Sequence, residues 1–270
     1  MNTVERKMLD ALKKGRDRYN VVAVKAEFEA EGTRPDEFHR LLELAQRADL
    51  KVALKIGGCE AVSDLLSSKI YGVDYIIAPM VETRYALSKF IDAKNKTHGS
   101  SDQGTEFLFN LETETTLHNL DEMSALAKGN VDGIVFGRVD FTLSCGMERT
   151  AVNDTRITDS VLQVAQACAD IDLELVVGGS VSNDAVDALR QFRSVRLDRF
   201  ETRKIVFDGL AVESDSIYDG IANAVAFELD WLRNKRDYYG EIANEDASRI
   251  AMMEKRAGYA PAQRHMSAVA

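Results

Sequence analysis

The sequence predicts an α/β protein folded as a (β/α)8 TIM barrel with an additional long C-terminal helical extension. Short runs rich in β-branched residues alternate with longer helical patterns, as in the βα units that build a parallel sheet. These units follow one another over roughly 200 residues, which suits a closed barrel better than an open sheet, the remaining alternative. The chain has only three prolines and no Gly/Ser-rich linker, so no domain boundary divides the units.

Seven strands are expected, at residues 21–30, 51–57, 73–81, 106–112, 131–137, 173–179 and 202–208. The helical patterns between them lie at residues 35–48, 59–72, 83–96, 117–129, 157–171 and 183–192. Pro35 stands in the first turn of its helix, where proline is tolerated. A (β/α)8 barrel needs one more strand. Either the first 20 residues supply it, although their pattern looks more helical, or the barrel closes in an irregular way.

Three segments divide the chain. We assign residues 1–220 to the barrel domain, residues 221–258 to the C-terminal helical extension and residues 259–270 to a disordered tail. The extension continues past what a barrel needs. Because such a helix more often docks on a neighbouring subunit than remains free in solvent, it predicts a homo-oligomer.

The composition of the 270-residue chain argues against several classes of function. Its formal net charge of −10 opposes general binding to nucleic acid or to an anionic membrane, since both are polyanions. No apolar stretch approaches the roughly 20 residues of a membrane span, and the N-terminal segment lacks the apolar block of a signal peptide. A cytoplasmic protein is expected. Cys59, Cys145 and Cys168 are far apart and odd in number, which indicates neither a disulfide framework nor a thiolate zinc site.

Two apolar runs that resemble buried strands each lead to a carboxylate, Glu112 after EFLFNL and Asp140 after VDGIVFGRV. In a parallel barrel the carboxyl ends of the strands open on one face, so these two side chains are expected to converge. Converging carboxylates repel each other, and Mg²⁺ or Mn²⁺ would remove the repulsion while keeping coordination positions for substrate oxygens. Helix capping by Thr113, Glu114 or Asp140 is the alternative, and spacing alone does not decide between the two.

Three motifs follow one another in this part of the chain: GVDYIIAPMVETRYAL at residues 72–87, FLFNLETETTLHNLDEM at 107–123 and VDGIVFGRVDFTLSCG at 131–146. Together they resemble signatures of the HpcH/HpaI aldolase and citrate lyase β-subunit family, over roughly residues 20–210. The resemblance implies a phosphoenolpyruvate/pyruvate-type barrel that uses a divalent metal to make or break carbon–carbon bonds next to a 2-oxo acid or a carboxylate. It also implies that Glu112 and Asp140 are the two metal-ligating carboxylates.

Two departures from this family concern expected catalytic residues. Lys55 in ALKIGG stands where the family's aldolases carry a substrate-binding arginine, and lysine keeps the charge without the bidentate fork. Glu31 in FEAEGTRPDEF stands where many members have a histidine tied to acid–base work. None of the histidines falls at an expected strand end: His39, His98, His118 and His265. We therefore expect Glu31, Glu27 or a metal-bound water to move the proton.

Further charged side chains are expected at the mouth of the barrel. Strand alternation from residue 21 onward turns Lys25 and Glu27 toward the lumen, unless this is an exposed edge strand. Arg138 suits a substrate with a second carboxylate or a phosphate, and equally a salt bridge to Glu112 or Glu148. Glycine turns expose backbone N–H groups to an anion, although they also serve plain chain reversal. The residues expected to bind an anion are Lys25, Gly137, Gly178, Gly179 and Ser180.

Three hypotheses about function result. The first is a divalent-metal-dependent lyase or aldolase that acts on a small anionic substrate through a pyruvate-like enolate, with Lys55 and Arg138 orienting anionic oxygens. The second is an aldolase or dehydratase that forms a Schiff base through Lys25, Lys55 or Lys204. The third is a non-catalytic barrel that acts as a binding protein through its C-terminal helix.

Overall fold

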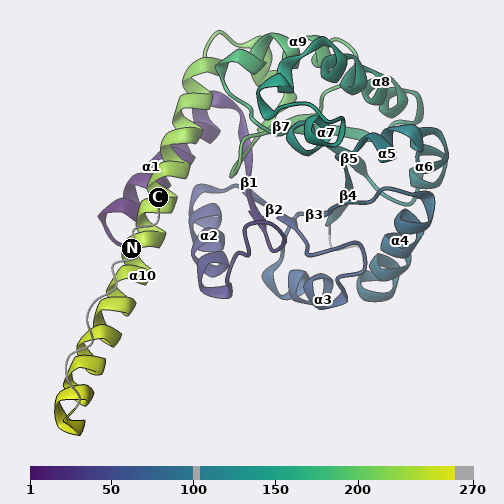
Figure 1. Cartoon of the computed structure of the whole chain (residues 1–270). Helices are drawn as coiled ribbons and strands as arrows, with labels where there is room; N and C mark the ends of the chain where they lie inside the picture. The colour runs from purple at the N-terminus through teal and green to yellow at the C-terminus, as the bar shows by residue number, and fades with distance from the viewer. Residues whose placement is uncertain (100–103, 259–270) are drawn as a thin grey trace.

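Eight strands pair side by side and close into a barrel (Figure 1). The computed structural model describes residues 1–99 and 104–258, so the expected disordered tail at 259–270 lies outside the described residues. The strands, in their order around the barrel, are β1 (Val21–Glu27), β2 (Lys51–Lys55), β3 (Tyr75–Ala78), β4 (Glu106–Leu111), β5 (Gly133–Gly137), β6 (Glu174–Gly178), β7 (Arg199–Glu201) and β8 (Ile205–Asp208). The predicted TIM-barrel class is confirmed.

Helices cover the outside of the barrel (Figure 1). They are α1 (Thr3–Tyr19), α2 (Pro35–Ala48), α3 (Val62–Tyr71), α4 (Arg84–His98), α5 (Glu114–His118), α6 (Leu120–Ala127), α7 (Arg138–Ser144), α8 (Thr155–Ile171), α9 (Val186–Arg193) and α10 (Ile217–Ala257), with the 3-10 turns η1 (Arg149–Asn153), η2 (Asn183–Ala185) and η3 (Gly209–Glu213). Helix α2 illustrates the pattern, because Phe38, Leu41 and Leu44 recur every three residues and are all buried. In residues 1–99 and 104–258, no helix combines the length and the apolar character needed to cross a membrane.

The barrel closes irregularly. Strands β1 to β7 run parallel, whereas β8 pairs antiparallel with both β7 and β1. Phe200 stacks on Phe207 across the β7–β8 hairpin, with ring centroids 4.8 Å apart. The strand that the sequence pattern left unassigned is thus β7, and the N-terminal segment forms α1 instead. A strand of three residues contains too little alternation to be recognised in the sequence.

Apolar side chains fill the interior of the barrel below a layer of polar residues at the C-terminal end of the strands. Eight buried residues form this inner cluster: Ala23, Ala53, Tyr75, Ile77, Leu108, Val135, Val176 and Val206. Because side chains alternate along a strand, the residue two positions later points into the same lumen, one layer higher. This next layer consists of Lys25, Lys55, Asn110, Gly137 and Gly178, at the C-terminal end of the strands.

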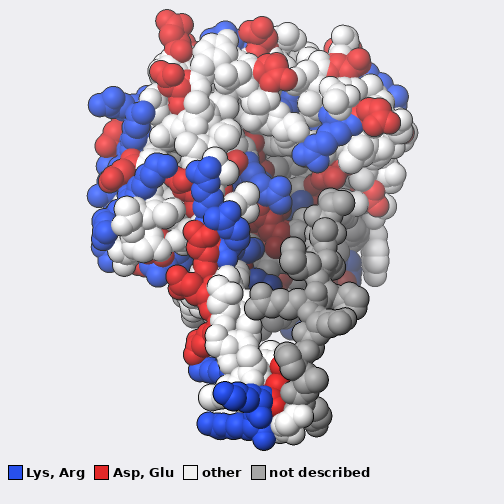
Figure 2. Space-filling view, turned by 60° about the vertical axis from the view of Figure 1, so that its left-hand side comes forward, with Lys and Arg blue, Asp and Glu red and all other residues white. Residues whose placement is uncertain are grey.

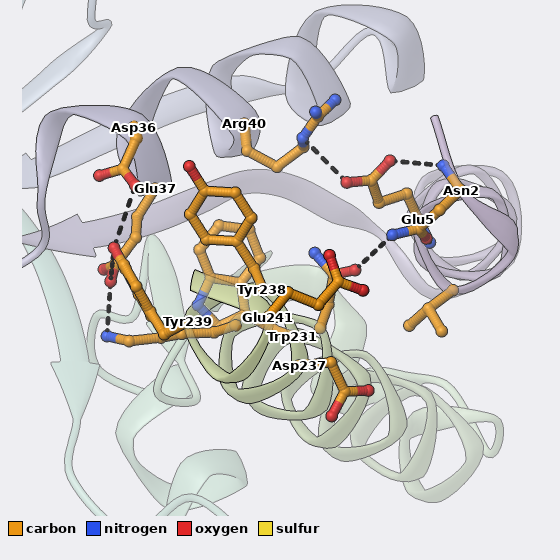
Figure 3. A pocket seen from close by; sticks show the side chains of 13 residues that line it. Asn2, Glu5, Asp36, Glu37, Arg40, Trp231, Asp237, Tyr238, Tyr239 and Glu241 are labelled. Carbon is orange, nitrogen blue, oxygen red and sulfur yellow. Dashed lines mark hydrogen bonds and ion pairs between the residues drawn. The ribbon is translucent and has the colours of Figure 1, made fainter. Parts of the chain in front are cut away.

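Helix α10 packs on α1 and is fastened to α2. Figure 3 shows the contact with α2, where the Tyr239 hydroxyl donates to the carboxylates of Asp36 and Glu37 at 3.1 and 2.9 Å. Lys235 Nζ lies 2.9 Å from Glu37 Oε1. These contacts border a cavity of about 410 Å³ that lies between α1, α2 and α10, away from the barrel mouth.

Beyond Tyr239 the helix leaves the barrel. Residues 241–253 are all exposed, and Figures 1 and 2 show this end of α10 standing clear of the body. At 1.5 Å per residue the whole helix is about 60 Å long. Large apolar side chains of the projecting part face solvent: Ile242, Ile250, Met252 and Met253. A helix without packing contacts gains little stability from propensity alone, so this part of α10 is suited to contact another molecule.

Candidate active site at the barrel mouth

A cavity of about 400 Å³ opens at the C-terminal end of the barrel strands. Four cationic and five acidic side chains line it: Lys25, Lys55, Arg149, Arg203, Glu27, Glu112, Asp140, Glu201 and Glu228. The glycine-rich turns expected to bind an anion also line it: Gly137, Gly178, Gly179 and Ser180. The fold therefore brings together the residues expected at the site, with the exception of Glu31 and Arg138.

Glu112 directly follows β4 and is only 2% exposed. Its Oε2 atom accepts a hydrogen bond from Asn110 Nδ2 at 2.5 Å and lies 3.4 Å from Lys55 Nζ. Its Oε1 atom accepts one from the Met80 N–H at 2.9 Å. Met80 presents this N–H from a left-handed backbone conformation, with φ at 50°, which is uncommon for a residue other than glycine. These three donors compensate a carboxylate that would be costly to bury alone.

Two glycines make room for carboxylates on neighbouring strands. A Cβ atom on Gly137, at the end of β5, would lie 2.9 Å from Oε2 of Glu112. A Cβ atom on Gly178, at the end of β6, would lie 2.8 Å from Oε1 of Glu201. Both distances are shorter than a carbon–oxygen contact allows, so a side chain at either position would displace a carboxylate of the mouth.

Asp140 lies in the first turn of α7, after β5 has ended at Gly137. Its side chain is exposed and lines the same cavity as Glu112. Among the described residues, none forms a hydrogen bond or an ion pair with the Asp140 carboxylate. The capping role that the sequence left open belongs to Thr113, whose Oγ1 accepts a hydrogen bond from the Thr116 N–H at 3.2 Å. Asp140 is thus available to a ligand.

The donor set suits a hard divalent cation. Glu112 and Asp140 supply carboxylate oxygens to one cavity, and Asn110 Oδ1 is a buried oxygen without a hydrogen-bond partner in the described part of the chain. Within residues 1–99 and 104–258, no three His, Cys, Asp or Glu side chains converge as a ready-made metal cluster. A cation held by two carboxylates would complete its shell with water or ligand oxygens, as Mg²⁺ and Mn²⁺ do.

Lys25 is buried between two carboxylates, 2.5 Å from Glu201 Oε1 and 3.2 Å from Glu27 Oε1. Burial lowers the pKa of Lys25, but Glu201 and then Glu27 outweigh this effect and raise that pKa above its ordinary value. Burial raises the pKa of Glu27, but Lys25 and then Lys55 outweigh it and lower that pKa below its ordinary value. At neutral pH the pair is therefore an ammonium and a carboxylate.

Lys55 is held in the same way, with Nζ 3.1 Å from Glu29 Oε2 and 3.4 Å from Glu112 Oε2. Burial opposes the charge, but Glu112 and then Glu29 raise the pKa of Lys55 above its ordinary value. A protonated amine is not a nucleophile, so neither Lys25 nor Lys55 is prepared to form a Schiff base.

Lys204 and Glu31 lie behind the mouth. Burial lowers the pKa of Lys204, with Glu31 acting in the opposite direction. The Lys204 ammonium contacts Glu31 Oε2, while Arg203 Nε donates to Glu31 Oε1 at 2.8 Å. Both Glu31 and Lys204 line a separate, smaller cavity under α10. This position does not support Glu31 as the group that moves the proton.

Arg138 is almost completely buried, with 1% exposed, and does not line the cavity. Its guanidinium donates to the carbonyl oxygens of Gly178 and Gly179 at 3.4 and 2.8 Å, and to Asn153 Oδ1 at 2.9 Å. Burial lowers its pKa to about 10. Arg138 forms neither of the expected salt bridges, to Glu112 or to Glu148. Its hydrogen bonds instead hold the backbone of the turn at Gly178 and Gly179.

Several residues of the mouth were not predicted. Asn110 was within reach of sequence reasoning, because it lies two positions before Glu112 and so shares its face of the strand. Glu201 lies on the three-residue strand β7, Arg149 on the turn η1 and Glu228 on α10. No local pattern of the sequence predicts that side chains from these elements line the cavity at the mouth.

A model of one protein family, HpcH/HpaI aldolase/citrate lyase, matches residues 49–194, which is more than half of the chain. The chain belongs to the HpcH/HpaI aldolase/citrate lyase family. The matched region includes Lys55, Glu112 and Asp140, and membership supports a lyase or aldolase activity. The resemblance noted in the sequence is thereby confirmed. No curated protein sequence matches the chain.

Solved structures share the barrel of this HpcH/HpaI family member at low sequence identity. An HpcH/HpaI aldolase from Desulfitobacterium hafniense DCB-2 matches with a TM-score of 0.58 and 11% identity, over 76% of this chain and 84% of its own. An HpcH/HpaI aldolase/citrate lyase family protein from Burkholderia cenocepacia J2315 matches with a TM-score of 0.58 and 11% identity, over 90% of this chain and 100% of its own. RipC from Yersinia pestis matches with a TM-score of 0.50 and 15% identity, over 76% of this chain and 88% of its own. At these identities the similarity establishes the fold alone.

Proposed function

We propose that this protein is a divalent-metal-dependent lyase or aldolase that makes or breaks a carbon–carbon bond next to the 2-oxo acid group of a small anionic substrate. Family membership supports the lyase chemistry and a small carboxylate substrate. One observation carries the finer proposal: buried Glu112 and exposed Asp140 line one cavity, and Asp140 has no partner among the described residues. Such a pair suits Mg²⁺ or Mn²⁺.

The chain's own residues complete the chemistry. When bound at Glu112 and Asp140, the cation supplies Lewis-acid stabilisation of the enolate charge that develops during bond cleavage. Lys55 and Lys25 stay protonated and present two fixed positive charges to the carboxylate and keto oxygens of the substrate. The backbone N–H groups of the turn from Gly178 to Ser180 are further donors to an anion.

We assign the proton transfer to Glu27 rather than to Glu31. Glu27 lines the cavity, and Lys25 and Lys55 hold its pKa below the ordinary value, so it is ionised at neutral pH. In the cleavage direction, an ionised carboxylate accepts the proton of the substrate hydroxyl group on the carbon atom whose carbon–carbon bond breaks. In the condensation direction, it returns the proton to the same oxygen. Glu31 is already engaged by Arg203 and Lys204 outside the cavity.

Calorimetric titration with oxalate, a stable mimic of the pyruvate enolate, tests the proposal. The wild type should bind oxalate only when Mn²⁺ or Mg²⁺ is present, and Asp140→Asn should abolish that binding. Asp159→Asn is the matched control, because Asp159 is an exposed aspartate on α8 outside the cavity. Oxalate binding that needs no metal, or that survives in Asp140→Asn, would refute the proposed site.

The Schiff-base mechanism differs in one observable. Reduction with borohydride in the presence of pyruvate fixes an imine covalently, so a Schiff-base enzyme gains the mass of the substrate. We expect no such adduct, since the pKa values of Lys25 and Lys55 are both raised, and Lys204, whose pKa burial lowers, does not line the cavity of the mouth.

We also propose that the protein forms a homo-oligomer through the projecting part of α10, residues 241–257. Its exposed apolar side chains and its lack of support from the barrel are the basis of this proposal.

A further inference from the structure

Two charged groups on the wall of the mouth have no partner among the described residues. The other charged side chains of the cavity are engaged in ion pairs, or in hydrogen bonds in the case of Glu228. The two exceptions are Asp140 and Arg149. The proposed function assigns Asp140 to the cation. Within the described part of the chain, Arg149 is then the cationic group of this cavity that has no carboxylate partner and can take a further group of the substrate.

Hydrogen bonds hold the backbone segment that carries Arg149. Arg149 is the first residue of η1, and Asn153, the last residue of η1, accepts a hydrogen bond from Arg138 at 2.9 Å. Arg138 in turn donates to the carbonyl oxygens of Gly178 and Gly179, which line the cavity. The backbone that carries Arg149 is therefore tied to the glycine turn of the mouth, while its side chain is exposed to incoming ligand.

We infer that Arg149 is a specificity-determining residue that binds a second oxyanion of the substrate, a carboxylate or phosphate remote from the 2-oxo acid group. This inference rests on the proposed function, which places the 2-oxo acid end at Glu112, Asp140 and Lys55. A guanidinium offers parallel N–H donors that match such an oxyanion in a bidentate way. Lys25 and Lys55, which face the 2-oxo acid end, are each paired with two carboxylates, and Arg203 is paired with Glu31. Among the described residues of the cavity, Arg149 is therefore the cation whose charge no carboxylate compensates.

A pair of matched ligands tests the inference. 2-Oxoglutarate and 2-oxopentanoate have the same carbon chain and differ in the distal carboxylate. In calorimetric titrations with Mn²⁺ present, Arg149→Ala should weaken binding of 2-oxoglutarate by about 10- to 100-fold, the usual effect of losing charge-assisted hydrogen bonds. Binding of 2-oxopentanoate should change by less than about twofold, because that ligand lacks the charged group. The phosphonate analogue 2-oxo-4-phosphonobutanoate distinguishes phosphate from carboxylate as the preferred group.

Two further variants complete the test. Arg149→Lys should restore part of the affinity for 2-oxoglutarate, since it keeps the charge without the fork. Arg84→Ala is the matched control, because Arg84 is an exposed arginine that begins α4 after β3 and does not line the cavity. A loss in Arg149→Ala that is equal for both ligands, or no loss at all, would overturn the inference and leave the proposed function standing. Failure of the wild type to bind either 2-oxo acid with Mn²⁺ would refute both.

Discussion

Glu112 and Asp140 have the same charge and opposite environments. Glu112 is buried and receives hydrogen bonds from Asn110 and from the Met80 N–H, whereas Asp140 is exposed and has no partner in the described part of the chain. Binding of a cation depends on both carboxylates. Stability depends on Glu112, because its removal leaves buried donors unpaired. The two residues therefore allow function and folding to be measured separately.

Substitution of these carboxylates should give a clear contrast. We expect Glu112→Gln to lower the free energy of unfolding by about 1–3 kcal/mol, since Lys55 loses the buried one of its two counter-charges. Asp140→Asn should change it by no more than about 0.5 kcal/mol. Both should lose Mn²⁺ binding. Urea unfolding and Mn²⁺ titration check this, and a variant that keeps full Mn²⁺ affinity would exclude its residue as a ligand.

Acid should remove the contribution of Glu27 to the stability of the fold. The pKa of Glu27 is lower in the folded protein than its ordinary value of 4.5, mainly because Lys25 outweighs the effect of burial. Its stabilising effect is therefore fully present above about pH 4.5 and is lost as the pH falls through the folded-state pKa. The stability difference between wild type and Glu27→Gln should be largest at neutral pH and should shrink below pH 4.5. Urea unfolding across this range measures the difference, and a difference independent of pH would contradict the Lys25–Glu27 pairing.

Among the elements, strands with several alternating or continuous apolar residues were predictable, and the short strand β7 was not. Each strand from β1 to β6, and β8 as well, lies within a range expected from the sequence, because strands of four to seven mostly buried residues leave a recognisable pattern. β7 has three residues, and its pairing with β8 depends on contacts across the barrel rather than on local sequence. The same limit explains why Glu112 and Lys55 were foreseen at the mouth while Glu201 was not.

Closure of the barrel after β8 depends on a glycine. A Cβ atom on Gly209 would lie 2.1 Å from the carbonyl oxygen of Leu197, and the Gly209 N–H donates to Asp198 O at 2.8 Å. We expect Gly209→Ala to destabilise the fold by about 3 kcal/mol or more, since the obstacle is backbone that cannot move aside. Gly240→Ala in α10 is the control, because nothing lies within 4 Å and alanine favours a helix by about 1 kcal/mol. Equal thermal stability of Gly209→Ala and wild type would contradict this role.

For the whole molecule, the feature that the fold of a single chain does not explain is the length of α10. The sequence predicted a helical extension, and α10 does run from Ile217 to Ala257, but its pattern could not indicate where support from the barrel stops. The last contacts with α2 are made by Lys235 and Tyr239. Beyond them the helix exposes apolar side chains that a monomer would leave in water.

Truncation should separate assembly from folding. Removal of residues 241–270 should give a smaller oligomer in light scattering coupled to size-exclusion chromatography, with the thermal unfolding of the barrel retained. Removal of residues 259–270 alone is the matched control and should leave the mass per particle unchanged apart from the deleted residues. An unchanged oligomeric state after the longer deletion would exclude α10 as the interface.

The most direct measurement of the proposed chemistry is exchange of the methyl protons of pyruvate with deuterium, followed by NMR. An enzyme that stabilises a pyruvate-like enolate must catalyse this exchange, because the enolate is the species that takes up solvent deuterium. We expect exchange that requires Mg²⁺ or Mn²⁺ and disappears in Glu112→Gln and Asp140→Asn. Exchange that is absent with every divalent cation, or equally fast in both variants, would contradict a metal-dependent enolate site at the mouth of this barrel.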